Sequence, residues 1–371
     1  MSQAPSTRLP LGTSLKSAYA NTEWISWDRC KDAIVVGGKN GLIEIFNLNE
    51  GKKILSHRVD DKDQHVAMLP YINKFVTASP NGQLGIYNFR GSKESALKDA
   101  PYLVSGISIN PSTVQLNKIA INAATEMSIY DDQLNERFRI PTAKHTTIKA
   151  CGFTGSHVYM VTAQYKRDPD PEFTRDKEAD GGLYTHTITK NLDLYDPKKG
   201  KLVQRHELSR SVSMSKDLPD WLPRLSAVAN AERLTILDDT RIIGYDLTQP
   251  PSDTNIPIEL AKTPFIPSQN YSAPKADYLS GVQSWELSAN GINLLACSNH
   301  DAENYHVSEI NLSTQEVTLL TSLSTKDFVQ YDEKRGTWLH ITKTGTITEH
   351  PLGPSHVRSR PRKQTATLEL F

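Results

Sequence analysis

A strand-turn-strand unit recurs along the chain and constrains its fold more than any other feature. Residues 33–54, "AIVVGGKNGLIEIFNLNEGKKI", read as an apolar strand, a tight turn and an alternating strand. Asn40-Gly41 supplies the positive φ angles that such a turn requires. The unit returns at 74–89, "KFVTASPNGQLGIYNF", and at 118–132, "KIAINAATEMSIYDD". Recurrence of this kind is typical of a repeat architecture.

Aligning the second strands of the units produces a column of one large residue followed by Asn or Asp. The column consists of Phe46-Asn47, Tyr87-Asn88, Tyr130-Asp131, Tyr195-Asp196, Tyr245-Asp246 and Ile310-Asn311, with a degenerate seventh copy near Glu349. The first two intervals, 41 residues (46 to 87) and 43 residues (87 to 130), match the blade period of a propeller. Longer intervals are explained by two predicted insert loops, near 166–182 and 248–274. The first is charged and the second carries six prolines.

Short strands that are separated by turns and repeated seven times predict an all-β fold. The predicted fold is a single seven-bladed β-propeller of four-stranded blades, followed by a flexible C-terminal tail. One blade cannot bury both of its faces, whereas neighbours in a ring bury them, and closure removes unpaired sheet edges. The predicted propeller spans residues 1–354 and the basic and apolar tail spans 355–371. Pro354 and Pro361 interrupt strand pairing at the start of the tail.

The repeated units resemble the WD40 family over roughly residues 20–352. The matching features are the strand, the Gly-rich turn, the second strand, and an aromatic residue before Asp or Asn where the family has Trp-Asp. No unit has the family's Gly-His pair, and no Trp stands in the column. A six- or eight-bladed ring of another family is the alternative fold. By the family's habit, the last blade takes its fourth strand from the N-terminus, near Thr13–Tyr19. Residues 355–359 are the alternative.

Composition limits the classes of partner. The charges of the 42 basic and 42 acidic residues cancel, which argues against electrostatic binding of nucleic acid over the whole surface. Direct nucleic-acid binding is expected only weakly, through Arg358, Arg360, Arg362 and Lys363. The three cysteines are too few and too scattered for a disulfide framework. Without a secretory signal or an apolar span, the expected location is cytoplasmic, or nuclear in a eukaryote, with no membrane contact.

Residues that could carry chemistry all have simpler structural explanations. The run "NHDAENYH" contains His300, Asp301, Glu303 and His306, but its position favours a polar hairpin over a metal site. The pair Asp238-Asp239 is assigned to a tight turn, and Cys151 to a buried position in a strand. We therefore expect no enzyme activity, no catalytic residues, no metal and no cofactor.

The C-terminal residues Leu368, Glu369, Leu370 and Phe371 resemble a short peptide motif that bacterial polymerases and repair proteins insert into the sliding clamp. The motif has the form Gln-Leu-x-Leu-Phe. Thr367 stands at its glutamine position, and Gln364 lies three residues earlier. The resemblance implies that the partner-binding residues are Gln364, Leu368, Leu370 and Phe371.

Three functions remain open from the sequence. The first is a non-catalytic platform for protein-protein interaction, a scaffold or subunit of a larger complex that binds protein partners on the propeller face. The second is a DNA replication or repair accessory protein that docks on the sliding clamp through its tail. The third is a propeller enzyme or a lectin, which would need convergent carboxylates or aromatic residues at the mouth of the ring.

Overall fold

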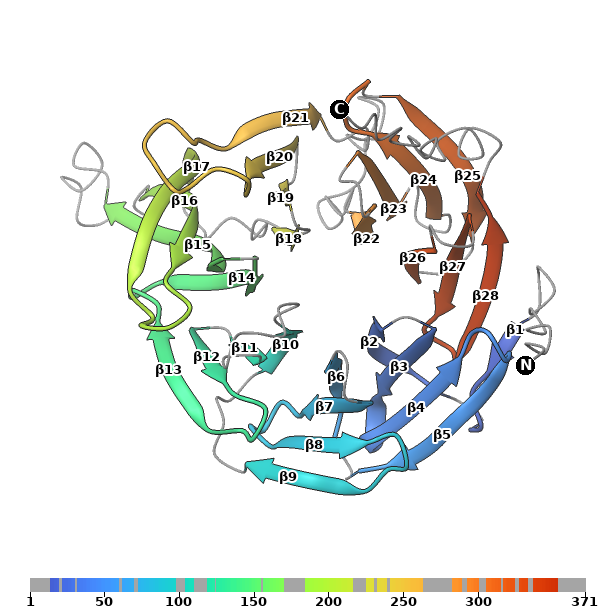
Figure 1. The fold of residues 1–371 in the computed structure, drawn as a ribbon. Coiled ribbons are helices and arrows are strands. Elements are labelled where there is room, and N and C mark those ends of the chain that lie inside the picture. The colour runs from blue at the N-terminus through green and yellow to red at the C-terminus, as the bar shows by residue number, and fades with distance from the viewer. Residues whose placement is uncertain are drawn as a thin grey trace, which may run out of the picture.

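In the residues that it describes, the computed structural model shows 28 strands, which form a closed ring (Figure 1). The strands form seven four-stranded sheets, so the predicted all-β, seven-bladed propeller is confirmed. Within the part of the chain that the structure describes, the single 3-10 turn Lys39–Gly41 is the only helical element, and no helix is long and apolar enough to cross a membrane. The structure describes residues 14–19, 22–30, 32–59, 62–69, 73–97, 104–109, 119–123, 125–154, 156–169, 184–215, 225–229, 232–238, 241–262, 282–288, 292–299, 305–314, 316–323, 327–332 and 336–352.

Each blade is an antiparallel sheet whose strands run in chain order from the centre of the ring outward (Figure 1). Blades 1 and 2 contain β2 (Trp24–Cys30), β3 (Ala33–Gly38), β4 (Leu42–Asn47), β5 (Lys52–Arg58), β6 (His65–Leu69), β7 (Lys74–Ala78), β8 (Leu84–Asn88) and β9 (Lys93–Leu97). Blades 3 and 4 contain β10 (Val104–Ile109), β11 (Ile119–Ala123), β12 (Glu126–Tyr130), β13 (Glu136–Pro141), β14 (Thr146–Phe153), β15 (Val158–Pro169), β16 (Tyr184–Tyr195) and β17 (Leu202–Ser215). Blades 5 and 6 contain β18 (Ser226–Ala229), β19 (Arg233–Asp238), β20 (Arg241–Asp246), β21 (Ile258–Lys262), β22 (Val282–Leu287), β23 (Asn293–Asn299), β24 (Tyr305–Asn311) and β25 (Val317–Leu323). Blade 7 contains β26 (Phe328–Asp332), β27 (Thr337–Thr342), β28 (Thr346–Pro351) and the N-terminal β1 (Ser14–Lys16).

The hydrophobic core is a series of layers between adjacent blades. Val35 and Ile45 of blade 1 pack with Met68, Phe75 and Tyr87 of blade 2 in one buried cluster. The seam between blades 7 and 1 is filled by a further cluster, whose members are Leu15, Trp24, Ile34, Val36, Leu42, Phe46, Leu48, Leu339, Ile341 and Ile347. No single blade therefore has a core of its own, and the ring gains its hydrophobic stabilisation only when neighbours meet.

The repeated column ends the third strand of each of the first six blades, and it has two physical roles. Its large residues, such as Phe46 and Tyr130, are fully buried between blades. Its Asn and Asp residues accept backbone N–H groups of the turn that follows. Asn47 Oδ1 accepts from Asn49 at 2.9 Å and Glu50 at 3.1 Å. The same bonds recur at Asn88, Asp131, Asp196, Asp246 and Asn311. Only short side chains with an acceptor oxygen reach these turn amides, which explains the restriction to Asn and Asp.

The N-terminal strand closes the ring, as predicted. β1 pairs antiparallel with β28, with Ser14 opposite Thr348 and Lys16 opposite Thr346, and Leu15 is buried in the seam. The first described strand, β1, therefore lies in blade 7, and the chain then crosses into blade 1, so β1 holds the last blade to the first. Residues 355–359, the alternative closing strand, lie outside the described residues.

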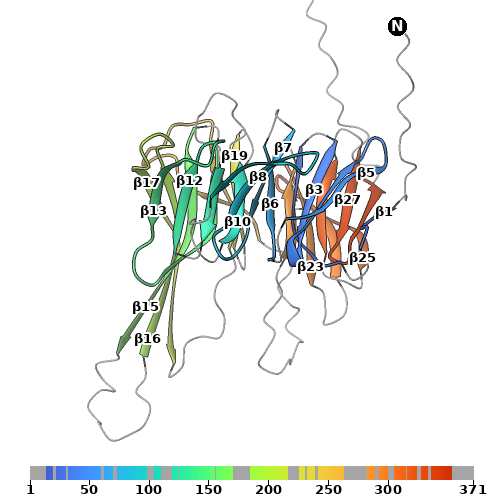
Figure 2. The ribbon, with the colours of Figure 1, turned by 90° about the horizontal axis from the view of Figure 1, so that it is seen from below.

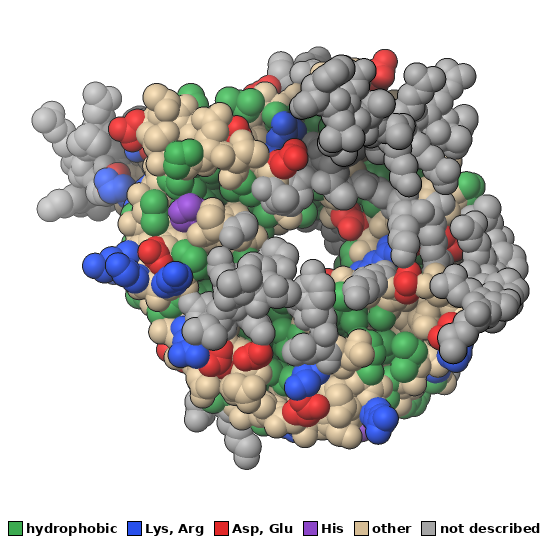
Figure 3. Space-filling model, in the orientation of Figure 1, with side chains coloured by type: hydrophobic (Ala, Val, Ile, Leu, Met, Phe, Trp, Pro, Cys, Tyr) green, Lys and Arg blue, Asp and Glu red, His purple; other side chains and the backbone are tan. Residues whose placement is uncertain are grey.

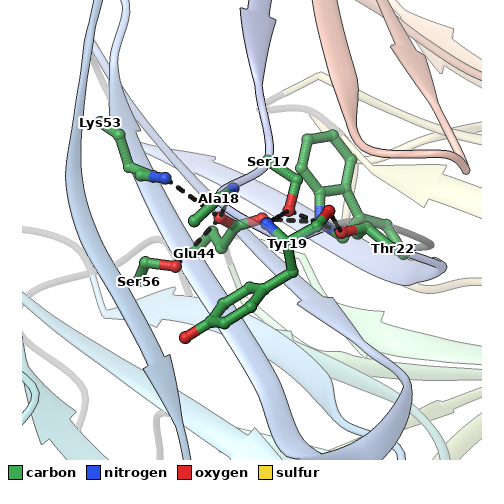
Figure 4. Close-up of polar contacts among 8 residues, drawn as sticks. Ser17, Ala18, Tyr19, Thr22, Glu44, Lys53 and Ser56 are labelled. Atoms are coloured by element: carbon green, nitrogen blue, oxygen red, sulfur yellow. Dashed lines mark hydrogen bonds and ion pairs between the residues drawn. The ribbon is translucent and has the colours of Figure 1, made fainter.

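The chain passes from β1 to β2 through a crossing segment, of which residues 17–19 and 22–23 are described. A fully buried carboxylate, Glu44 of β4, holds this crossing segment in place (Figure 4). Its Oε1 accepts the backbone N–H of Ala18 at 2.8 Å and the hydroxyl of Ser56 at 3.1 Å. Its Oε2 accepts the indole N–H of Trp24 at 3.2 Å, and Lys53 Nζ lies 3.6 Å from Oε1. A buried carboxylate is tolerated only when its lone pairs are met in this way, so Glu44 and the crossing segment require one another.

The β27–β28 hairpin holds the same segment from the side of blade 7. The carbonyl of Gly345 accepts the N–H of Ser17 at 2.7 Å, and the carbonyl of Lys343 accepts the N–H of Trp24 at 2.8 Å. The hairpin is itself positioned by Asp327, which accepts the N–H of Lys343 at 3.0 Å. The crossing segment is thus bonded to both blades that it joins.

At the centre of the ring, acidic side chains join innermost strands of adjacent blades. Asp28 of β2 accepts the backbone N–H of Met68 on β6 at 2.7 Å. Glu286 of β22 accepts the backbone N–H of Tyr331 on β26 at 2.6 Å. These contacts satisfy backbone donors on the inner edges of the blades, and burial raises the pKa of Asp28 to about 6.

The predicted insert loop at 166–182 is wrong at its start, because residues 166–169 continue β15. β15, β16 and β17 are 12, 12 and 14 residues long, and they project from one face of the ring (Figure 2). Lys166 and Arg167 pair with Thr187 and His186 in an unbroken register. Charge predicted a loop here, but a charged strand is stable when its backbone is paired and its side chains reach solvent. Residues 170–182 lie outside the described residues.

The predicted insert loop at 248–274 is also wrong in part, because it contains β21, the outermost strand of blade 5. The sequence of β21, "IELAK", contains no proline, and Pro257 stands immediately before it. Proline is disfavoured in the interior of a central strand, whereas the residue that precedes a strand tolerates it. Residues 263–274 lie outside the described residues.

Replacing Glu44 with alanine is expected to destabilise the whole ring, because it leaves the Trp24 indole, the Ala18 amide and Lys53 without their shared acceptor. Removal of one partner from a buried charged network costs about 3–5 kcal/mol. Chemical denaturation of Glu44→Ala should show a loss of this size. The control is Glu50→Ala, which removes a half-exposed partner of Lys52 and should cost less than about 1 kcal/mol. Equal stability of the two variants would contradict the role of Glu44.

The raised pKa of Asp28 predicts a specific pH dependence of stability. The folded protein keeps this proton up to about pH 6, whereas the unfolded chain releases it near the model-peptide value of 3.8. The free energy of unfolding that depends on Asp28 therefore falls as the pH rises from about 4 to about 6, by roughly 2–3 kcal/mol in total. Asp28→Asn retains an acceptor for Met68 and should lack this fall. If the free energy of unfolding varies with pH in the same way in the wild type and in Asp28→Asn, the pKa of the Asp28 carboxyl is not raised in the folded protein.

Candidate functional site

The partner-binding residues expected from the sequence lie outside the described residues. This applies to Gln364, Leu368, Leu370 and Phe371, and also to the basic run Arg358, Arg360, Arg362 and Lys363. Docking of these residues on a sliding clamp therefore stays a prediction from the sequence.

The other residues considered for chemistry are placed only in part. His306 lies in β24, whereas His300, Asp301 and Glu303 fall outside the described residues, and the residues described contain no group of three His, Cys, Asp or Glu side chains that could hold a metal. Asp238 is the last residue of β19, and Asp239 is not described. Burial raises the pKa of Cys151 to about 12, so its thiol stays protonated and unreactive.

A groove on the outer rim, between blades 4 and 5, is the strongest candidate site in the described residues. Its volume is about 370 Å³, and it lies between β17 of blade 4 and β20 and β21 of blade 5. The residues that line it are Arg205, His206, Glu207, Leu208, Arg241, Ile243, Ile256, Pro257 and Glu259. We call this the blade 4–5 groove.

A charged network fixes the groove between its two blades. Arg241 of β20 donates to the carbonyl of Leu208 at 2.7 Å, and its Nε lies 3.5 Å from Asp238. Asp238 also pairs with Lys190 of β16, and both side chains are buried. Blade 4 contributes Lys190 and Leu208, whereas blade 5 contributes Arg241 and Asp238. The groove is therefore built on a rigid contact rather than on a loop.

His206 places an unsatisfied polar atom in the lining. The side chain is 9% exposed, and its ring centroid lies 5.2 Å from that of Tyr245. Burial lowers the pKa of His206, so the imidazole is neutral near pH 7. Its buried Nε2 has no hydrogen-bond partner among the residues described. A buried polar atom of this kind costs about 1–3 kcal/mol while it lacks a partner.

Exposed aliphatic residues lie on the two segments that carry the lining residues. Leu202 and Val203 at the start of β17, and Ile256 and Ile258 around the start of β21, are each 47–57% exposed. The two segments are held together by Gln204, which donates to the carbonyl of Ser252 at 2.6 Å. Four exposed large aliphatic residues on two neighbouring segments form an apolar surface that is typical of a contact site.

The groove combines apolar contact area with few polar groups and holds its charges in internal pairs. Arg205, for example, forms two bonds with the buried carboxylate of Asp193, at 2.7 and 2.8 Å. Such a surface suits the binding of a polypeptide better than the binding of a highly charged ligand. Space-filling shows charged and apolar side chains interspersed on the face of the ring, which is open at its centre (Figure 3).

Sequence reasoning did not find the groove, because it assigned residues 248–274 to a loop. The aliphatic residues Ile256 and Ile258, within an otherwise proline-rich segment, were the available signal. The contribution of His206 could not be read from the sequence, since its burial depends on Tyr245 of the next blade.

Comparison with known proteins shows the fold. No model of a known protein family and no curated protein matches the sequence. The β-propeller domain of Myceliophteria thermophila Cps50 (Swd1) is similar in structure, with a TM-score of 0.63 and 12% identity, covering 92% of this chain and 100% of that one. The computationally designed protein Ika8 gives a TM-score of 0.53 and 11% identity, covering 91% and 98%. At these identities the likeness concerns architecture alone, and the chain has the fold of a seven-bladed β-propeller.

Proposed function

We propose that this protein is a non-catalytic platform for protein-protein interaction, and that the blade 4–5 groove binds a segment of a partner protein. The observation that carries the proposal is the buried, unsatisfied Nε2 of His206 in a groove that is also lined by the exposed Ile256. A partner segment that places apolar side chains against Ile256 and Ile258 removes their surface from water. The same segment can offer a backbone group to His206.

The geometry of the groove supports binding in preference to catalysis. Arg205 and Arg241 are engaged with Asp193 and Asp238, which orients them. The two carboxylates that line the groove, Glu207 and Glu259, are also in ion pairs, 3.1 Å from Arg210 and 3.9 Å from Arg241. A rigid propeller with function in its surface features is also the usual use of such a fold. The enzyme and lectin alternatives gain no support from these contacts.

The division of the chain into a propeller at 1–354 and a partner-binding tail at 355–371 belongs to the same proposal. The tail and the groove would then be two contacts of one platform. Two linked weak contacts bind more tightly than either contact alone, because the second acts at a high effective concentration.

Charge introduced at the apolar rim of the groove is expected to abolish partner binding. Burial of each of the two isoleucines contributes about 1.5–3 kcal/mol, so the double variant Ile256→Asp, Ile258→Asp should lose at least about 100-fold in affinity. The test is affinity capture from the native source with the wild type and this variant. The expected result is a protein that the wild type retains and the variant loses.

Two further variants sharpen the test. Ile54→Asp carries the same change on the exposed outer strand of blade 1 and should retain the partner. His206→Phe keeps an aromatic ring against Tyr245 but lacks Nε2, and it should weaken binding about tenfold, as expected for one lost hydrogen bond. Retention of the same proteins by the wild type and the rim variant would contradict the proposal.

A further inference from the structure

The outermost strand of blade 6, β25, has an unpaired edge of unusual composition. β25 has the sequence "VTLLTSL" and pairs with β24 on its inner side, where Val317 lies opposite Ile310. It is the last strand in its sheet (Figure 1). Alternate backbone N–H and C=O groups of such a strand point toward the free edge, and no backbone group among the described residues pairs with them there.

β25 differs from the outermost strands of the other blades in having no charged residue and no proline. Natural proteins protect exposed edges with charges, prolines or very short strands. The outermost strands of the other blades all carry at least one charged residue: "KKILSHR" in β5, "KESAL" in β9, "ERFRIP" in β13, "LVQRHELSRSVSMS" in β17, "IELAK" in β21 and "SLK" in β1. The lack of charge is therefore specific to blade 6.

The strand is anchored on one face and exposed on the other. Leu320 and Leu323 pack against the core cluster that contains Val329 and Trp338. Val317 and Leu319 are 45% and 55% exposed, and their separation by one residue places them on the same side of the strand. A register shift at Leu320 interrupts the strand, but an equivalent shift occurs in β5, β9, β13, β17 and β21 and does not distinguish β25.

We propose that β25 binds an extended segment of a partner protein, which adds to blade 6 as a fifth strand. Backbone hydrogen bonds to the free edge would supply affinity, and aliphatic side chains at alternate positions of the segment would pack on Val317 and Leu319. This site is separate from the blade 4–5 groove, and the proposal does not depend on that groove.

The small size of the edge favours a peptide over a second copy of the ring. Two rings that meet edge to edge along β25 would contact mainly through the seven residues of each strand. A stable interface between folded proteins uses about 20–30 residues on each side. An extended peptide needs far less, because it follows the strand and covers the exposed aliphatic residues beside it.

The test uses a synthetic twelve-residue peptide that alternates valine and threonine, with a lysine at each end for solubility. Hydrogen exchange of the full chain, measured with and without the peptide, should show slower exchange at residues 317–323 than at the other outermost strands. Fluorescence anisotropy should give a dissociation constant of about 10–500 μM, typical of a short strand addition without optimised side chains.

Three comparisons identify the mode of binding. Leu319→Lys adds the missing edge charge and should weaken peptide binding at least tenfold, whereas Ile54→Lys on β5 should leave it unchanged. The same peptide with N-methyl groups at alternate amides cannot pair with an edge, and it should not bind. The groove variant Ile256→Asp, Ile258→Asp should bind the peptide like the wild type, which separates failure at this strand from failure of the proposed groove.

Several results would overturn the proposal. Absence of binding at about 1 mM peptide, equal protection of all outermost strands, or equal binding of the N-methylated peptide would exclude strand addition at β25. A concentration-dependent dimer that Leu319→Lys abolishes would identify a second copy as the occupant. Strong protection of residues 317–323 in the free, dilute protein would identify a segment of this same chain as the occupant.

Discussion

The hydrogen bonds of the segment between β1 and β2 decide whether this chain is a ring or an open row of blades. Every buried layer lies between two blades, so an open row would expose two of these surfaces at once. Glu44 in blade 1 and the β27–β28 hairpin in blade 7 bind this one segment from both sides. The desolvation cost of burying Glu44 is offset only while the segment donates its hydrogen bonds to the carboxylate. The segment in turn is held in place by those same bonds to Glu44. Closure is therefore cooperative.

Side-chain oxygens that accept backbone N–H groups recur around the ring. Each Asn or Asp of the column satisfies a turn within its own blade, as Asn47 and Asp196 do. Between blades, Asp28 and Glu286 satisfy backbone donors of the next innermost strand, and Lys190 meets Asp238 farther out. These contacts fix the angle between neighbouring blades. A rigid frame of this kind allows the outer surfaces, including the blade 4–5 groove and β25, to vary without loss of the fold.

The sequence predicted what is local and repeated, and it failed where contacts join distant residues. The column of Phe46 to Ile310 was found because turn chemistry and strand patterning depend on neighbouring residues. The closing strand at the N-terminus was found because the resemblance to the WD40 family implied it. β21 and the extension of β15 at Lys166 were missed, because proline and charge were read as signs of a loop. Each segment nevertheless has a neighbouring strand to pair with, β20 for β21 and β16 for β15. The groove was missed for a different reason. His206 is buried by a residue of another blade, and no pattern within β17 records that contact.

The N-terminal segment closes the ring, and we expect it to stabilise all seven blades together. Differential scanning calorimetry of a chain that lacks residues 1–18 tests this claim most directly, because the deletion removes β1, the burial of Leu15 and the amide bonded to Glu44. We expect a fall of about 5–10 °C in the midpoint of unfolding, with a broader transition as the blades lose their cooperativity. A single sharp transition within about 1 °C of the full-length midpoint would contradict it.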